Sequence, residues 1–208
     1  MGLNHAKTSE SQAKWPAHRI NNAMMAILGY AELALEELED DSPVRRYINQ
    51  IEIAARRLGD ADDTFNATSR PAIRPQSADT PFKGNVLVTD DEETVIEVTQ
   101  NMLRRHGYAV IPALGGREAI DILRRRDSEV AAVLLDCNMP DINGIQALHD
   151  IRQIDQSIPV ILSSGQDEAE IIERIKGDGP DAYVKKPYRA EALAAILDRL
   201  LSARDKRA

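Results

Sequence analysis

The chain has a single cysteine, Cys137, among its 208 residues, which excludes an internal disulfide and is typical of a reducing compartment. Aromatic residues make up only 4% of the sequence, so a hydrophobic core would consist mainly of Leu, Ile, Val and Ala. No hydrophobic run approaches the roughly 20 residues that cross a bilayer. The polar stretch Met1–Lys14 also lacks the hydrophobic centre of a signal peptide. These absences predict a cytoplasmic protein that does not contact a membrane.

Positive charge is scarce as well. The formal net charge is −8 at pH 7, and the densest basic stretch is Arg124–Arg126. Three arginines in one helical turn more often form a solvated surface than a nucleic-acid binding site. We therefore expect no nucleic-acid partner.

Proline marks a boundary near residue 70. Residues 71–83 contain Pro71, Pro75 and Pro81 among Ser, Thr and Asp, a composition typical of a linker. This linker separates residues 1–70, where the hydrophobic pattern is helical, from residues 84–208, where strand and helix patterns alternate.

Residues 1–70 show two series of hydrophobic residues spaced by three and four positions, as in amphipathic helices. The series are Ile20, Met24, Ile27, Ala31, Ala34, Leu38 and then Val44, Ile48, Ile51, Ala55, Leu58. The break at Asp40–Pro43 predicts a hairpin, with Asp41 or Ser42 capping the second helix and Pro43 in its first turn. Because one hairpin buries its hydrophobic seam poorly, we expect a homodimer that forms a four-helix bundle.

Residues 84–208 alternate between five strand patterns and five helix patterns. The expected strands are 85–89, 108–112, 130–135, 160–163 and 182–185, and the expected helices are 94–105, 116–126, 142–154, 168–176 and 190–201. Alternation of this kind with short loops predicts an α/β domain whose parallel sheet is covered by helices on both faces. The fold class expected for the whole chain is therefore α + α/β.

Charged residues stand at the ends of three of these strands. Asp90 and Asp91 follow the first strand, Asp136 follows the third and Lys186 follows the fifth. The carboxyl ends of parallel strands share one edge of the sheet, where ligands bind near the point at which the strand order reverses. We therefore expect the acids and the lysine to converge. The alternative, a solvated acidic cluster, would place like charges together without a cation.

The motifs around these positions resemble those of response-regulator receiver domains. The matching segments are Asp90–Asp91, Leu135–Pro140 with Gly144, Pro159–Gly165 and Tyr183–Tyr188. The resemblance spans about residues 84–202. It implies a flavodoxin-like, doubly wound sheet of five parallel strands in the order 2-1-3-4-5.

The resemblance also implies a role for each charged residue. Asp136 would be the nucleophile that accepts a phosphoryl group. Mg²⁺ would be held by Asp90, Asp91, Asp136 and the backbone carbonyl of Asn138, since this ion prefers carboxylates and neutralises developing charge. Lys186 would place a positive charge on the phosphoryl oxygens.

Three further features follow from the same resemblance. Ser164 matches the hydroxyl that bonds the phosphoryl group, and Tyr183 matches the aromatic switch residue whose rotamer follows that hydroxyl. Lys186–Pro187 matches a cis peptide bond. Lys185, one residue out of register, is expected to face the other way.

The helical half is similar to the dimerisation and histidine-phosphotransfer domain of sensor histidine kinases, on Ala17–Asn22 and Ile27–Leu33. This similarity implies that His18, outside the packed seam, is a candidate phosphohistidine. Asn22 matches the amide that orients water when a receiver is dephosphorylated. Arg19 departs from the family, because the residue after the histidine is normally an acid that acts as a base. His18 is thus either a phosphotransfer residue or a silent residue on a dimerisation hairpin.

No ATP-binding domain follows the hairpin. Gly115–Gly116 does not form a phosphate-binding motif, so an autonomous histidine kinase is not expected. The sequence predicts a two-component phosphorelay protein whose partner is a histidine kinase or a phosphotransfer protein. Three alternatives stay open: a dimeric interaction module gated by phosphorylation with a silent His18, a receiver that binds partners without phosphorylation, and a phosphatase that uses Asn22 on a partner's phospho-aspartate.

Overall fold

The computed structural model describes residues 17–59, 82–126, 129–166, 168–175 and 179–205. Five parallel strands form one sheet: β1 (Gly84–Thr89), β2 (Tyr108–Ala113), β3 (Val130–Asp136), β4 (Val160–Ser164) and β5 (Ala182–Lys185). Their order is β2-β1-β3-β4-β5, which confirms the order implied by the resemblance. Every strand boundary lies within one residue of the expected position.

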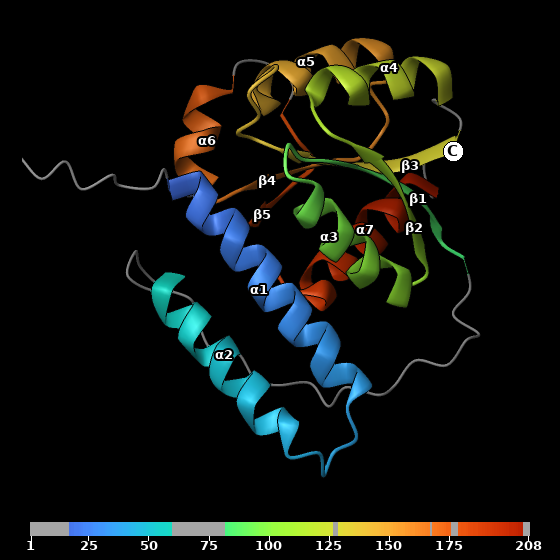
Figure 1. The fold of residues 1–208 in the computed structure, drawn as a ribbon. Helices are drawn as coiled ribbons and strands as arrows, with labels where there is room; N and C mark the ends of the chain where they lie inside the picture. The colour runs from blue at the N-terminus through green and yellow to red at the C-terminus, as the bar shows by residue number, and fades with distance from the viewer. Residues whose placement is uncertain (1–16, 60–81, 127–128, 167, 176–178, 206–208) are drawn as a thin grey trace, which may run out of the picture.

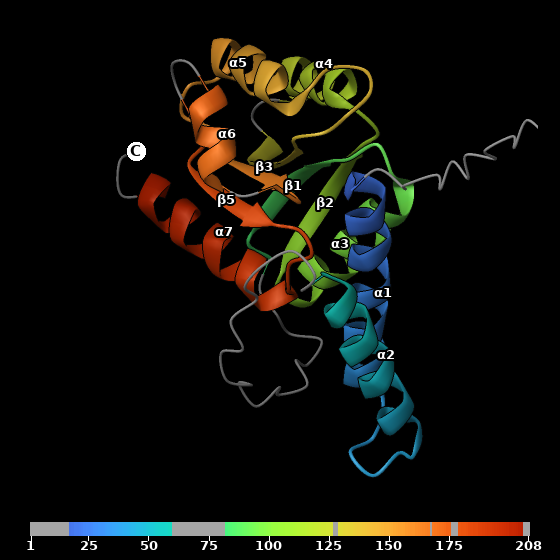
Figure 2. The ribbon, with the colours of Figure 1, turned by 90° about the vertical axis from the view of Figure 1, so that its left-hand side faces the viewer.

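Helices cover both faces of this sheet (Figures 1 and 2). They are α3 (Glu93–Arg105), α4 (Gly116–Arg126), α5 (Gly144–Ile154), α6 (Glu168–Arg174) and α7 (Ala190–Asp205). Alternate residues of β1 divide between two cores: Val86 and Val88 pack with α3 and α7, and Leu87 packs with α4, α5 and α6. This alternation is expected for a strand buried on both faces.

Three expected helix boundaries differ from the observed ones by two residues or more, and one of them is the end of α6, which lies at Arg174 instead of residue 176. The helix expected from residue 142 begins at Gly144, because the side chain of Asn143 caps it by accepting a hydrogen bond from the Gln146 amide at 2.9 Å. The last helix continues to Asp205, four residues beyond the expected end. None of the described helices combines the length and hydrophobicity needed to span a bilayer.

Two antiparallel helices lie at the positions predicted for the hairpin: α1 (Ala17–Glu37) and α2 (Val44–Gly59) (Figure 1). The Arg45 guanidinium donates hydrogen bonds to the Leu35 and Leu38 carbonyls, both at 2.6 Å, and so satisfies the free end of α1. Residues 1–16 and 60–81, which include most of the predicted linker, lie outside the described residues.

Helix α1 packs along α3 of the α/β domain, a contact that the hydrophobic periodicity did not predict (Figures 1 and 2). Met25 is fully buried in the core that α3 and α7 share. Gly29 allows the close approach, because a Cβ atom there would lie 2.1 Å from Val98 Cγ1. At the edge of this contact, the Tyr30 hydroxyl donates to Glu97 at 3.2 Å. The hairpin is therefore docked on the domain that follows it in the chain.

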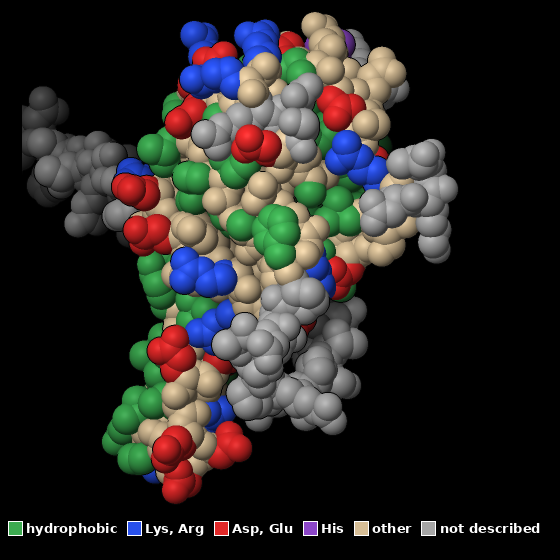
Figure 3. Space-filling model, turned by 90° about the vertical axis from the view of Figure 1, so that its right-hand side faces the viewer, with side chains coloured by type: hydrophobic (Ala, Val, Ile, Leu, Met, Phe, Trp, Pro, Cys, Tyr) green, Lys and Arg blue, Asp and Glu red, His purple; other side chains and the backbone are tan. Residues whose placement is uncertain are grey.

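The hydrophobic residues predicted to form the dimer interface differ in their exposure in the folded chain, where some are buried and others face outward. Met24 and Ala31 are buried, whereas Ile20, Ile27 and Ile51 are 43%, 44% and 51% exposed. Val44 and Tyr47 are exposed too, and hydrophobic side chains gather on the part of the hairpin that projects beyond the sheet (Figure 3). The hairpin thus keeps an outward hydrophobic face after α1 has docked.

Glu32 of α1 and Glu191 of α7 face each other across the docked interface, with Glu36 close by. Burial, and then the charge of Glu191, raises the pKa of Glu32 to about 7, although Arg189 and the Ala190 amide oppose the shift. The Glu32 carboxyl group therefore binds its proton more tightly in the folded chain than in the unfolded chain. Its unfolding free energy should fall as the pH rises from 4.5 to about 7, and stay at the lower value above that range.

Glu32→Gln should remove this pH dependence, since an amide does not ionise. We expect the variant to match the wild type near pH 5 and to exceed its unfolding free energy at pH 8 by about 1–3 kcal/mol. Urea unfolding at the two pH values measures the difference. Glu39→Gln, at the exposed hairpin turn, is the matched control and should behave as the wild type does. Equal pH dependence in both variants would contradict the assignment to Glu32.

Candidate functional site

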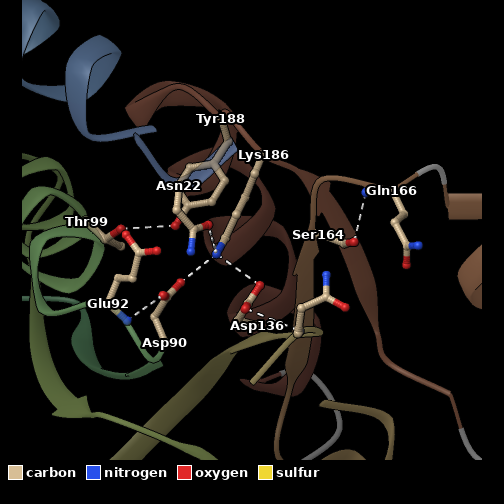
Figure 4. A network of polar contacts seen from close by, with 10 residues as sticks. Asn22, Asp90, Glu92, Thr99, Asp136, Ser164, Gln166, Lys186 and Tyr188 are labelled. Atoms are coloured by element: carbon tan, nitrogen blue, oxygen red, sulfur yellow. Dashed lines mark hydrogen bonds and ion pairs between the residues drawn. The ribbon is translucent and has the colours of Figure 1, made fainter. Parts of the chain in front are cut away.

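Three strand ends bring a lysine and two acids into contact (Figure 4). Asp90 follows β1, Asp136 ends β3 and Lys186 follows β5. The Lys186 ammonium lies 2.6 Å from Asp90 Oδ2 and 2.9 Å from Asp136 Oδ1. All three residues are buried, with exposed fractions of 2%, 3% and 2% for Asp90, Asp136 and Lys186. The predicted convergence at the carboxyl edge of the sheet is confirmed.

The charges of this cluster depend on one another. Burial by itself lowers the pKa of Lys186, but the carboxylates of Asp90 and Asp136 more than reverse that effect, and the net pKa lies above its ordinary value. Lys186 is therefore an ammonium ion at neutral pH. Burial raises the pKa of Asp90 to about 6, with a further contribution from Asp136, despite the opposing charge of Lys186.

The acidic residues fit a divalent cation. Carboxylate oxygens of Asp90, Asp91 and Asp136 all lie within 4.8 Å of one another. Asp91 Oδ1 is buried and has no hydrogen-bond partner among the described residues, and burial raises the pKa of this carboxyl group. A buried acceptor without a donor, beside two more carboxylates, matches the oxygen ligands that Mg²⁺ prefers. The Asn138 amide donates to Asp136 Oδ2 at 3.2 Å; the role of its carbonyl as a ligand stays a prediction.

The remaining receiver-like positions surround this cluster. Ser164 is buried at the end of β4, and its hydroxyl accepts a hydrogen bond from the Gln166 amide at 3.0 Å. Tyr183 is half-buried and packs against the core beneath α4, α5 and α6. Lys185 is exposed whereas Lys186 is buried, as the strand alternation predicts. The Lys186–Pro187 peptide bond is cis, as the resemblance implied.

Helix α1 contributes a residue to the same site. The Asn22 side chain is 4% exposed, and its Oδ1 accepts a hydrogen bond from the Lys186 ammonium at 3.2 Å (Figure 4). The sequence singled out Asn22 as an amide that would act on a partner's receiver, yet it lies at this chain's own site.

His18 belongs to the first turn of α1, four residues before Asn22. Its side chain lies outside the description, so its predicted phosphorylation stays a prediction.

Two contacts near the site were not predicted. A Cβ atom on Gly165 would lie 1.8 Å from Asn21 Nδ2, so the start of α1 presses against the loop after β4. The Tyr188 hydroxyl lies 3.0 Å from Thr99 Oγ1, which ties the segment after Lys186 to α3.

A glycine in the middle of a helical pattern often marks a close packing contact, so Gly29 was the one signal in the sequence that could have pointed to docking of α1 on α3.

Comparisons with known proteins agree with this geometry. The family model described as the Response regulator receiver domain matches residues 86–198. The probable transcriptional regulatory protein TcrX of Mycobacterium tuberculosis is 37% identical over 118 residues, covering 56% of this chain and 49% of TcrX. The two-component response regulator ORR26 of Oryza sativa is 34% identical over 116 residues, which are 56% of this chain and 20% of ORR26. This chain therefore spans half the length of these relatives or less.

Solved structures show the same fold. A receiver domain protein from Clostridium thermocellum superposes with a TM-score of 0.56 at 24% identity, covering 61% of this chain and 100% of that protein. A receiver protein from Sinorhizobium medicae gives a TM-score of 0.52 at 25% identity, covering 58% of this chain and 96% of that protein. The family match begins at residue 86, so it leaves the hairpin outside. The kinase-like resemblance of the hairpin and the expected lack of nucleic-acid binding stay predictions.

Proposed function

The chain belongs to the response regulator receiver domain family, and on this premise we propose that it is a two-component signalling protein that accepts a phosphoryl group on Asp136. The observation that carries this proposal is the contact of a buried ammonium, Lys186, with both Asp136 and Asp90 at hydrogen-bonding distance. Phosphoryl transfer to a carboxylate needs positioning and charge stabilisation more than covalent assistance. The cluster supplies both.

Each residue has a defined part in the transfer. A carboxylate oxygen of Asp136 forms a bond to phosphorus, while the bond between phosphorus and the donor breaks and the donor keeps the electron pair. Lys186 stabilises the negative charge on the phosphoryl oxygens. Asp90, Asp91 and Asp136 would hold Mg²⁺, which supplies positive charge to the same oxygens when bound. Ser164, at the end of the neighbouring strand, would donate a hydrogen bond from its hydroxyl to the phosphoryl group on Asp136.

The partners would be a histidine kinase or a phosphotransfer protein, and His18 is a candidate carrier in exchange with Asp136. Its support is the motif around it, Ala17–Asn22. Incubating the full chain with Mg²⁺ and a phosphorylated partner, then mapping the label, tests both residues. A label that is lost in base marks an acyl phosphate, expected on Asp136, and a label that survives base but is lost in acid marks a phosphohistidine, which peptide mapping would assign to His18. A chain that takes no label would contradict the proposal.

The position of Asn22 supports a second candidate function, dephosphorylation of phospho-Asp136. An amide at the site would orient a water molecule so that its oxygen bonds to phosphorus while the bond between phosphorus and Asp136 breaks, which releases inorganic phosphate and regenerates the carboxylate. The supporting observation is the contact of 3.2 Å with Lys186, a residue of the acceptor cluster. This activity would shorten the lifetime of the phosphoryl group without changing its rate of formation.

The exposed face of the hairpin supports a homodimer. Ile27 and Ile51 are about half exposed in the single chain, on helices that would form a four-helix bundle with a second copy. Ile27→Glu and Ile51→Glu should each dissociate the dimer, because an unpaired charge in the interface costs several kcal/mol, on the order of 3 or more. Sedimentation velocity measures the change.

The matched control for the dimer is Leu114→Glu, which places the same charge on an exposed hydrophobic residue outside the hairpin. It should leave the dimer intact. A wild-type chain that sediments as a monomer at all concentrations, or hairpin variants that stay dimeric, would contradict this interface.

A further inference from the structure

The Lys186 ammonium has no hydrogen-bond donor to spare in this structure. An ammonium group carries three N–H donors. Three oxygens accept from it: Asp90 Oδ2 at 2.6 Å, Asp136 Oδ1 at 2.9 Å and Asn22 Oδ1 at 3.2 Å. A phosphoryl oxygen can therefore bind Lys186 only if one of these acceptors leaves. Asn22 is the neutral acceptor and the most distant, so it is the one that leaves at the smallest cost.

The first turns of α1 also lie beside the cluster that contains Asp136. Asn22 is buried against the cluster. Asn21 lies so close to Gly165 that a Cβ atom added to Gly165 would be 1.8 Å from the side-chain nitrogen of Asn21, Nδ2. The acceptor carboxylate itself is only 3% exposed. Phosphoryl transfer requires the donor to approach in line with the attacking oxygen. The docked position of α1 and the approach of a donor therefore compete for the same space.

We propose that the hairpin is an internal gate on the acceptor site: docking of α1 and phosphorylation of Asp136 exclude each other, and Asn22 is the positioning residue that links them. This inference rests on the proposed function of Asp136. A phosphoryl oxygen takes the place of Asn22 Oδ1 at Lys186, and α1 loses its buried polar contact. By thermodynamic linkage, docking of the hairpin disfavours phosphorylation of Asp136 by the same factor by which phosphorylation disfavours docking.

The contacts that hold the gate closed extend well beyond the acceptor site. Met25 lies in the core shared by α3 and α7, and Gly29 lies against Val98 and Met102. Arg105 of α3 forms ion pairs with Glu36 and with Glu37, the latter at 3.0 Å. Docking can therefore be weakened at Gly29, without any change to a residue that contacts the acceptor cluster.

Two substitutions test the gate in the chain of residues 1–208. Asn22→Ala removes the acceptor from Lys186, and a hydrogen bond to a charged group corresponds to roughly a tenfold change or more in an equilibrium constant. Gly29→Ala adds a Cβ atom 2.1 Å from Val98 Cγ1 and so opposes docking from a distance. Both should raise the initial rate of Asp136 phosphorylation by acetyl phosphate and Mg²⁺, Asn22→Ala by about tenfold. Gly179→Ala, where no atom lies within 4 Å of the added Cβ, is the matched control and should keep the wild-type rate.

A second measurement reports on α1 directly. Beryllium fluoride with Mg²⁺, a mimic of the phosphoryl group, should increase amide hydrogen exchange in α1 of the wild type and leave exchange unchanged in Asp136→Asn. This readout stays decisive if Gly29→Ala folds poorly.

The outcomes separate the gate from the other proposals. Wild-type rates in both variants, with α1 equally protected in the presence of beryllium fluoride, would overturn the gate and leave Asp136 as the acceptor. A slower loss of label in Asn22→Ala with an unchanged rate of formation would overturn the gate in favour of the phosphatase function. No label on any form of the chain would overturn the acceptor function and the gate with it.

Discussion

Replacing Asp136 by asparagine should abolish labelling of the chain by acetyl phosphate and Mg²⁺. The carboxylate oxygen is the nucleophile, and a neutral amide of the same shape does not form a stable bond to phosphorus under these conditions. The shape of the site should largely be retained, because the amide oxygen of the substituted side chain can still accept from Lys186, as Asp136 Oδ1 does at 2.9 Å, and only the contact of Oδ2 with the Asn138 amide at 3.2 Å is lost. Intact-protein mass spectrometry measures the added phosphoryl group.

The controls for this experiment are chemical and structural. Asp121→Asn removes a carboxylate from the exposed surface of α4 and should label as the wild type does. Removing Mg²⁺ with a chelator should also prevent labelling of the wild type, since the three acids would then face the phosphoryl oxygens with Lys186 as the one positive charge between them among the described residues. Undiminished labelling of Asp136→Asn would show that another residue is the acceptor.

Replacing Lys186 by methionine should affect both the reaction and the stability of the fold. Asp90 and Asp136 would be left buried together without the ammonium that now lies 2.6 and 2.9 Å away from them. Breaking a buried ion pair in this way costs about 3–5 kcal/mol of unfolding free energy. The initial labelling rate should fall about a hundredfold, as expected when one stabilising donor is lost from a reacting centre. Added Mg²⁺ should restore part of the stability, because it replaces the lost positive charge.

Lys185→Met is the matched control for the lysine. The two residues are neighbours at the end of β5, but Lys185 is exposed, so its loss should change neither the labelling rate nor urea unfolding appreciably. If Lys186→Met unfolds at the same urea concentration as Lys185→Met, the two carboxylates do not depend on the ammonium for their burial. The assignment of Lys186 as the charge-stabilising residue would then be wrong.

The local pattern of residues 84–208 was sufficient to predict the α/β domain and the centre of its site. Strands buried on both faces have continuous hydrophobic runs, and their carboxyl ends must share one edge of a parallel sheet. Asp90, Asp136 and Lys186 each follow such a run, so their convergence could be predicted without knowing any distance. The strand alternation likewise distinguished the buried Lys186 from the exposed Lys185.

The sequence by itself therefore determined the sheet, its covering helices and the acids and lysine at its edge, because each depends on short-range patterns and on the geometry of parallel strands. Only the tertiary structure decided where the hairpin lies. A hydrophobic helix face has the same periodicity whether it packs on a second copy or on α3 of its own chain, so periodicity could not place Asn22 beside Lys186, 164 residues away. That contact depends on packing between residues distant in sequence, at Met25 and at Gly29, where the absence of a side chain lets α1 approach Val98. The acceptor site is a property of the local sequence, and its coverage by α1 is a property of the folded chain.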